Sequence, residues 1–147
     1  MTKEQLKKYC EAEFENIDAV VSEVFSVVQP NKLEYSTAEL AAIAAFIHNF
    51  YNGIENILKK VLTFKHIEIK ETSTWHKELL KSSFTTGIIT SGLYDTLSNY
   101  LSFRHFFVHS YSFVLRWEEL KPLVDSLEET LQGFKSIIYS YFNKLYQ

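Results

Sequence analysis

Hydrophobic residues recur every three or four positions along most of the chain, which is the spacing that gathers them on one face of an α-helix. No stretch shows the strict alternation of a β-strand, and no internal repeat or glycine-rich linker divides the chain. The pattern therefore predicts an all-α, up-and-down helical bundle in a single domain over residues 1–147. Its helices are expected at about residues 3–29, 37–65, 75–81, 91–111 and 117–142.

Polar residues at the helix starts support these limits. Thr2 with Gln5, and Ser36 with Glu39, match the capping box, in which two side chains bond free backbone N–H groups of the first turn. Pro30 ends the first helix, since it has no N–H group with which to continue it. Turns are expected near residues 82–87 and 112–115.

Composition excludes several classes of protein. The chain has 147 residues, 46% of them hydrophobic, and a single cysteine, so it can bury a core but cannot be a disulfide scaffold. The longest strongly apolar run, Leu40–Ile47, is far shorter than the roughly 20 residues of a membrane span, and Met1–Lys8 is too polar for a secretion signal. We therefore expect a cytoplasmic protein. A net charge of -3 argues against a non-specific coat for nucleic acids.

Aromatic residues make up 16% of the chain, with 12 Phe, 9 Tyr and 2 Trp. Such side chains supply large buried areas and are enriched at interfaces, so this composition predicts a surface that binds a partner.

The expected fourth helix carries two apolar stripes where a surface helix of a monomer needs one. We expect the Phe-rich stripe to pack on its own bundle and the Leu-rich stripe to pack on a second protomer. The Phe-rich stripe consists of Tyr100, Phe103, Phe107 and Val114, and the Leu-rich stripe of Leu93, Leu97, Leu101, Arg104, Val108 and Tyr111; a polar stripe that includes His105 and His109 separates them.

Arg104 and His109 are the candidates for chemistry on this helix. A buried guanidinium needs an anion, and either a phosphate or a carboxylate of a neighbouring helix fits the position of Arg104. Histidine is the side chain whose unperturbed pKa lies near neutral pH, so His109 suits proton transfer, although its polar surroundings also fit an ordinary surface histidine. On an ideal helix the two residues are about 140° apart, so they do not share a face. A symmetric dimer would line one cleft with two copies of each.

Residues 104–111, with the sequence RHFFVHSY, resemble the R-x4-H-x-Y motif of HEPN-domain ribonucleases, in the form found in HepT-like toxins. The bare Arg and His spacing arises by chance in about one such chain in five, and the added tyrosine lowers this to roughly 1%. Residues 51–58, YNGIENIL, look like the second-helix segment of that family. The resemblance covers essentially the whole chain.

The resemblance implies a metal-independent endoribonuclease toxin that uses no cofactor, forms a homodimer with the motif in the interface cleft, and cleaves RNA, with tRNA as one candidate. Arg104 and His109 would be catalytic, and His105, where many members carry Asn, would support them. A nucleotidyltransferase (MntA-like) antitoxin would neutralise the toxin by adenylylating Tyr111. His105 and His109 also have a spacing used for zinc, but Cys10 stands alone and no third ligand is evident, so no metal site is expected.

A non-enzymatic helical adaptor that binds a nucleotidyltransferase is the alternative. It explains the two-sided fourth helix, but leaves the combination of Arg104, His109 and Tyr111 to chance. Glu55 either orients a residue of the cleft or faces water. Several cations either guide RNA or are ordinary surface charges: Lys59, Lys60, Lys65, Arg116 and Lys121.

Overall fold

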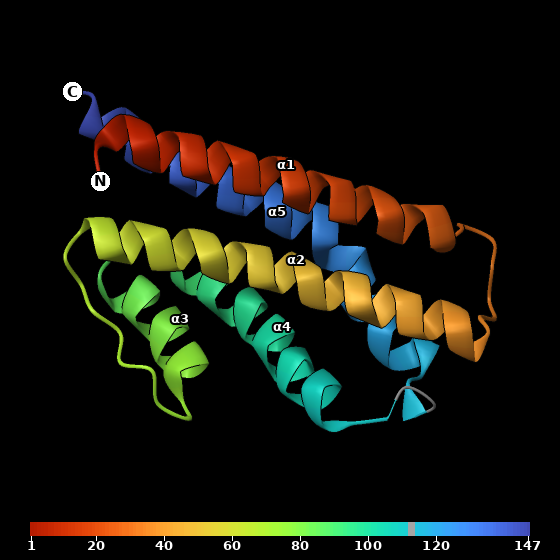
Figure 1. Ribbon diagram of the computed structural model, residues 1–147. Coiled ribbons are helices and arrows are strands. Elements are labelled where there is room, and N and C mark those ends of the chain that lie inside the picture. The colour runs from red at the N-terminus through yellow and green to blue at the C-terminus, as the bar shows by residue number, and fades with distance from the viewer. Residues whose placement is uncertain (112–113) are drawn as a thin grey trace.

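The computed structural model describes residues 1–111 and 114–147. Within these residues the chain forms five α-helices and no strand, so the all-α bundle that the hydrophobic spacing predicts is confirmed. None of these helices combines the length and the apolar character needed to cross a lipid bilayer. The helices are α1 (Lys3–Val27), α2 (Thr37–Phe64), α3 (Trp75–Thr85), α4 (Ser91–His109) and α5 (Trp117–Leu145) (Figure 1).

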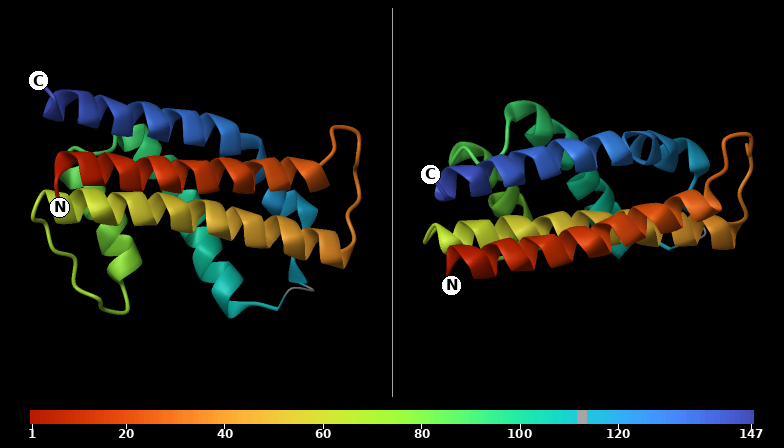
Figure 2. Two further views of the ribbon diagram at one scale, coloured as in Figure 1. Left: turned by 45° about the horizontal axis from the view of Figure 1, so that its top comes forward. Right: turned by 90° about the horizontal axis from the view of Figure 1, so that it is seen from above.

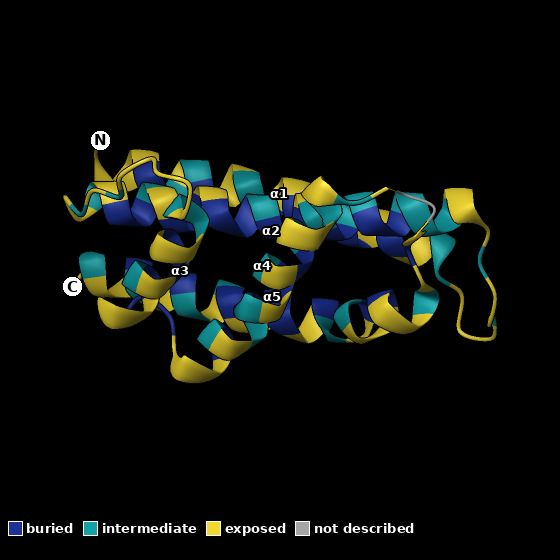
Figure 3. Ribbon diagram, turned by 90° about the horizontal axis from the view of Figure 1, so that it is seen from below, coloured by how far each residue is buried: buried dark blue, intermediate teal, exposed yellow. Residues whose placement is uncertain are grey.

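The central helix of the bundle is α2, which contacts each of the other four helices. It runs antiparallel to α1, while α3 and α4 diverge from one side of it (Figure 1). Apolar side chains from all five helices form one buried core, and the buried segments lie where the helices face one another (Figure 3). Both chain ends lie at the same end of the bundle (Figure 2), where the Lys3 Nζ donates a 3.0 Å hydrogen bond to the carbonyl of Leu145.

A glycine sets the close approach of α1 and α2. A Cβ atom built on Gly53 would lie 2.5 Å from the Cγ1 of Ile17, which is closer than carbon atoms pack. Any other residue at this position would force the Ile17 side chain or the α1 backbone to move. Because α2 also carries polar residues beneath α3 and α4, its close packing on α1 helps to fix where those polar residues lie.

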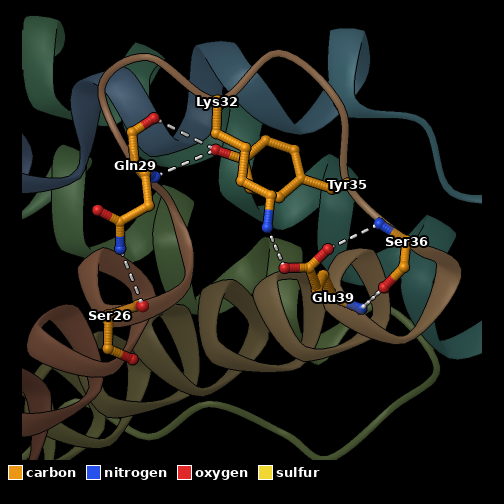
Figure 4. A network of polar contacts seen from close by, with 6 residues as sticks. All are labelled: Ser26, Gln29, Lys32, Tyr35, Ser36 and Glu39. Carbon is orange, nitrogen blue, oxygen red and sulfur yellow. Dashed lines mark hydrogen bonds and ion pairs between the residues drawn. The ribbon is translucent and has the colours of Figure 1, made fainter.

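The loop between α1 and α2 is held by a network of polar contacts (Figure 4). Ser36 and Glu39 form the predicted capping box, with hydrogen bonds of 2.9 and 3.1 Å. Glu39 also forms an ion pair with Lys32. Earlier in the loop, the Gln29 backbone N–H donates to the Tyr35 hydroxyl at 3.2 Å. The capping box predicted at the start of α1 is present as well.

Several helix ends differ from the prediction: α1 stops at Val27, α5 continues to Leu145, and the ends of α3 and α4, which border the site, differ as well. The turn expected from residue 82 begins later, because α3 continues to Thr85. Ser83 stays helical with its hydroxyl bonded to the carbonyl of Leu79 at 2.8 Å, and the chain reverses only near Gly87, whose φ of 81° favours glycine. At the other end of this region, α4 stops at His109 rather than near residue 111. Part of the break expected at 112–115 lies outside the described residues.

The prediction that the Leu-rich stripe of α4 faces a second protomer is wrong for its first half. Leu93 and Leu97 are buried in the core of their own chain, as are Tyr100 and Phe103 of the Phe-rich stripe. The reason is that α4 contacts α2, α3 and α5, so it needs apolar residues on two sides. Only the C-terminal end of the stripe is left open, where Val108 is 45% exposed.

Candidate active site between α3 and α4

A cavity of about 510 Å³ lies between α3 and α4. Residues just before α3 and in its first two turns form one wall, and α4 from Tyr94 to His105 forms the other; Figure 1 shows how the two helices diverge here. Among the residues described, no acidic side chain lines it, while two permanent cations and two histidines do. Such a lining favours an anion. The lining residues are Ser73, Thr74, His76, Lys77, Leu80, Tyr94, Ser98, Leu101, Ser102, Arg104 and His105.

Arg104 lies half-buried in the wall of this cavity, on the part of α4 that packs toward α2. Its Nε atom is buried and has no hydrogen-bond partner. The sequence suggested that Arg104 binds either a phosphate or a carboxylate of a neighbouring helix. No carboxylate of the described residues forms an ion pair with it. A buried guanidinium donor without a partner is costly, so this atom is suited to bind an incoming anion.

Glu55 lies under the cavity, on α2, and is only 4% exposed. The Nδ1–H group of His76 donates to both of its carboxylate oxygens, at 2.9 and 3.1 Å. Burial raises the pKa of the Glu55 carboxyl, while the hydrogen bond from His76 and the positive charge of Arg104 act in the opposite direction. Of the two roles considered for Glu55, the one facing water is wrong; the residue holds a side chain of the cavity in place.

Two further polar groups of α2 lie one and two turns before Glu55. Burial and the nearby Glu55 carboxylate raise the pKa of the Tyr51 hydroxyl, while burial and the charge of Arg104 lower the pKa of the His48 imidazole. Asn52 donates a 3.1 Å hydrogen bond to the Nε2 of His48. The repeat of polar residues at helical spacing thus gives α2 a polar face under Arg104 in an otherwise apolar helix.

The second half of the motif lies apart from Arg104 within one chain. His105 lines the cavity and its ring lies 4.7 Å from that of His109, but His109 itself is exposed and is not part of the lining. Tyr111 is 74% exposed and borders a separate small hollow. We expected it to follow the stripe of Arg104; it does not, because the helix ends at His109 and Ser110 is extended.

The other cations named from the sequence lie mainly in surface contacts. Lys59 pairs with Glu71 at 3.7 Å, and Lys121 pairs with Asp125 at 2.8 Å. Arg116 is exposed at the start of α5. Over the part of the chain that the structure describes, no group of three His, Cys, Asp or Glu side chains is arranged to hold a metal ion.

A family model described as HepT-like protein matches residues 42–145, which is more than half of the chain. The chain belongs to the HepT-like family. No curated protein and no solved structure gives a match. In this HepT-like chain the matched segment runs from the second turn of α2 to the end of α5, so it contains Glu55, His76, Arg104 and His109.

His76 and Lys77 are the residues of this HepT-like site that the sequence analysis missed. They stand at the start of a short helix beside Trp75, and no spacing rule links them to residues on α2 or α4. The available signal was weak: Glu55 is an acidic residue in a helix whose buried residues are mostly apolar, and such a residue requires a partner from another element.

Proposed function

We propose that this HepT-like protein is a metal-independent endoribonuclease, the toxin of a toxin–antitoxin pair, acting in the cytoplasm. The observation that supports this best is Arg104, whose buried Nε lacks a partner in a cationic cavity and which lies five residues before His109 in an R-x4-H-x-Y motif. A planar guanidinium that forms no ion pair with a carboxylate of the described residues is suited to grip a phosphodiester.

In the proposed reaction, His109 either takes the proton from a ribose 2′-hydroxyl or gives one to the leaving 5′-oxygen. Arg104 neutralises the charge that grows on the phosphorane oxygens, and His105, which lies between them, supports their placement. The products are a 2′,3′-cyclic phosphate and a 5′-hydroxyl end. Only RNA supplies the attacking group, so tRNA is a candidate substrate and DNA is not.

A homodimer would complete the site. Near the end of α4, Phe106, Val108 and Val114 are 37%, 45% and 41% exposed, which is unusual for apolar residues so close together. Packing this surface against a second copy would bury it and would bring His109 of one protomer toward the cavity of the other. This arrangement accounts for the distance between Arg104 and His109 within one chain.

Regulation by a nucleotidyltransferase antitoxin fits the position of Tyr111. The side chain is 74% exposed in the single chain and lies two residues past the end of α4. Adenylylation there would add a bulky anion next to the dimer cleft, where it would compete with the RNA phosphate for Arg104.

The test compares wild type with His109→Ala on one RNA sequence and on its all-deoxy equivalent. We expect wild type to cut only the RNA, leaving 2′,3′-cyclic phosphate ends, and the variant to be slower by about 10²- to 10⁴-fold. Cleavage of the deoxy strand, or an unchanged rate for His109→Ala in a folded protein, would contradict the proposal.

A further inference from the structure

One imidazole in the cavity wall, that of His76, is bonded through its Nδ1 to the buried carboxylate of Glu55 beneath the cavity, and neither residue belongs to the R-x4-H-x-Y motif. We propose that His76, held by Glu55, is the general base of the site, and that its Nε2 takes the proton from the ribose 2′-hydroxyl of the RNA. This inference rests on the proposed ribonuclease function and assigns the two proton transfers that it leaves open.

The hydrogen bond to Glu55 fixes which nitrogen of His76 can accept a proton. An ionised carboxylate only accepts hydrogen bonds, so the hydrogen lies on Nδ1, between the two oxygens at 2.9 and 3.1 Å. The lone pair is therefore on Nε2, and no hydrogen bond from the described residues occupies it. The His76 side chain keeps 21% exposure and lines the cavity. Its ring also packs on Trp75, with centroids 3.9 Å apart, which further limits its orientation.

Glu55 connects His76 to Arg104 electrostatically. The buried carboxylate accepts the hydrogen bond of His76 and is close enough to Arg104 for the guanidinium charge to act on it. Once His76 has taken a proton, the adjacent carboxylate stabilises the resulting imidazolium, as the carboxylate does in other carboxylate–histidine pairs. Arg104 would hold the phosphate in the same cavity, whose volume of about 510 Å³ lies in the range of roughly 300 to 1,000 Å³ typical of ligand sites.

The complete step then has two imidazoles with separate duties. The 2′-oxygen loses its proton to Nε2 of His76 and forms a bond to phosphorus. The bond from phosphorus to the 5′-oxygen breaks, and the 5′-oxygen receives a proton from the His109 imidazolium. The net change is a ribose 2′,3′-cyclic phosphate and a free 5′-hydroxyl. No metal ion or other reactant is needed for the atoms and charges to balance.

The deciding variant is His76→Asn, because the asparagine amide can replace the Nδ1–H donor to Glu55 but has no group at the position of Nε2. The matched control is His66→Asn, since His66 is exposed and its φ of 61° is a conformation that asparagine tolerates. We expect His76→Asn to cut RNA at least about 10²-fold more slowly and His66→Asn to cut at the wild-type rate. A 2′-O-methyl RNA of the same sequence should bind equally to all three proteins.

The pH profile separates a base from a residue that only shapes the cavity. A general base must be unprotonated to act, so any fall in the wild-type rate toward low pH that depends on this base should be absent from the residual activity of His76→Asn. Should the variant fold poorly, the imidazole resonances of His76 in the wild type can be followed by NMR instead. They should shift when the 2′-O-methyl RNA binds.

The results distinguish this inference from the proposed function. If wild type cuts RNA and His109→Ala does not, but His76→Asn cuts at the wild-type rate, the role of His76 is overturned and the ribonuclease stands. Equal losses of binding and cleavage in His76→Asn, or His76 resonances that do not respond to the RNA, would also overturn it. A wild type that cuts no RNA would overturn both.

Discussion

The two ends of the R-x4-H-x-Y motif lie in different surroundings, although they are less than two helical turns apart. Arg104 is half-buried in a cavity whose walls come from α3 and α4, with the polar face of α2 beneath it. His109 is exposed at the last residue of α4, and Tyr111 is more exposed still. A single chain therefore surrounds Arg104 with residues of three helices, but leaves His109 and Tyr111 exposed.

The contrast shows what each end needs in order to act. Around Arg104, the imidazole of His76 and the carboxylate of Glu55 are already joined by hydrogen bonds, so the groups that we propose for the attacking step are preorganised. Around His109, the neighbouring features are the ring of His105 and exposed apolar side chains. We infer that a second copy of the chain supplies what is missing at that end.

Removing the guanidinium should have a larger effect than either of the two changes considered after it. Arg104→Ala is expected to lower the rate of RNA cleavage by about 10²- to 10³-fold, because a preorganised cation in a partly buried site contributes that much. Arg104→Lys should restore little of it, since an ammonium group cannot form a planar fork. The only other arginine, Arg116, is exposed, so Arg116→Ala serves as the control and should stay within about threefold of wild type by the same initial-rate assay.

The next largest effect is expected from a charge placed at the exposed C-terminal end of α4, because it should weaken the proposed dimer. Val108→Asp is expected to weaken self-association by about tenfold or more, because it places a carboxylate in the apolar interface. Sedimentation velocity over a dilution series measures this directly, and RNA cleavage should fall in parallel. Leu33→Asp is the matched control, since Leu33 is 84% exposed in the loop between α1 and α2. An equal change in both variants would refute an interface at this end.

The smallest expected effect concerns the buried carboxylate of Glu55, near Arg104. Folding raises the pKa of Glu55, and such a carboxyl stabilises the fold when protonated and loses that contribution as the pH rises through its folded pKa. The unfolding free energy of wild type should therefore fall relative to that of Glu55→Gln between pH 4 and pH 7. The change should be smaller than the cost of an unpaired buried polar group, which is about 1–3 kcal/mol. Urea titrations measure it, with exposed Glu68→Gln expected to show no trend.

The sequence was sufficient for the parts of the fold that depend on nearby residues. The capping boxes of α1 and α2 need only residues three apart, and both are present. The helix limits that failed depend on context: Ser83 and its neighbours suggested a turn, yet they stay helical where α3 packs on α2 and α4. The burial of Leu93 and Leu97 likewise required knowing that α4 has three neighbours.

In the candidate site, too, the sequence indicated single residues but not contacts between distant helices. Arg104 stood out because a charge in an apolar stripe requires an anion, and the structure does leave its Nε without a partner. The pair of Glu55 and His76 could not be inferred, because their contact spans 21 positions and joins two helices whose relative placement no local pattern encodes. Tyr111 was placed on the stripe of Arg104 by extending the helix beyond His109, where the chain has already become extended.

The most direct test of the account is whether Arg104 and His109 of different protomers act on one phosphodiester. Arg104→Ala and His109→Ala proteins, each inactive alone, are mixed under conditions that exchange subunits, and cleavage is measured. A mixed dimer has one site with both groups intact, so we predict recovery of about a quarter of the wild-type rate when half of the dimers are mixed. Arg104→Ala mixed with the double variant should stay inactive. A mixture of the two single variants that shows no recovery, despite confirmed subunit exchange, would contradict the account.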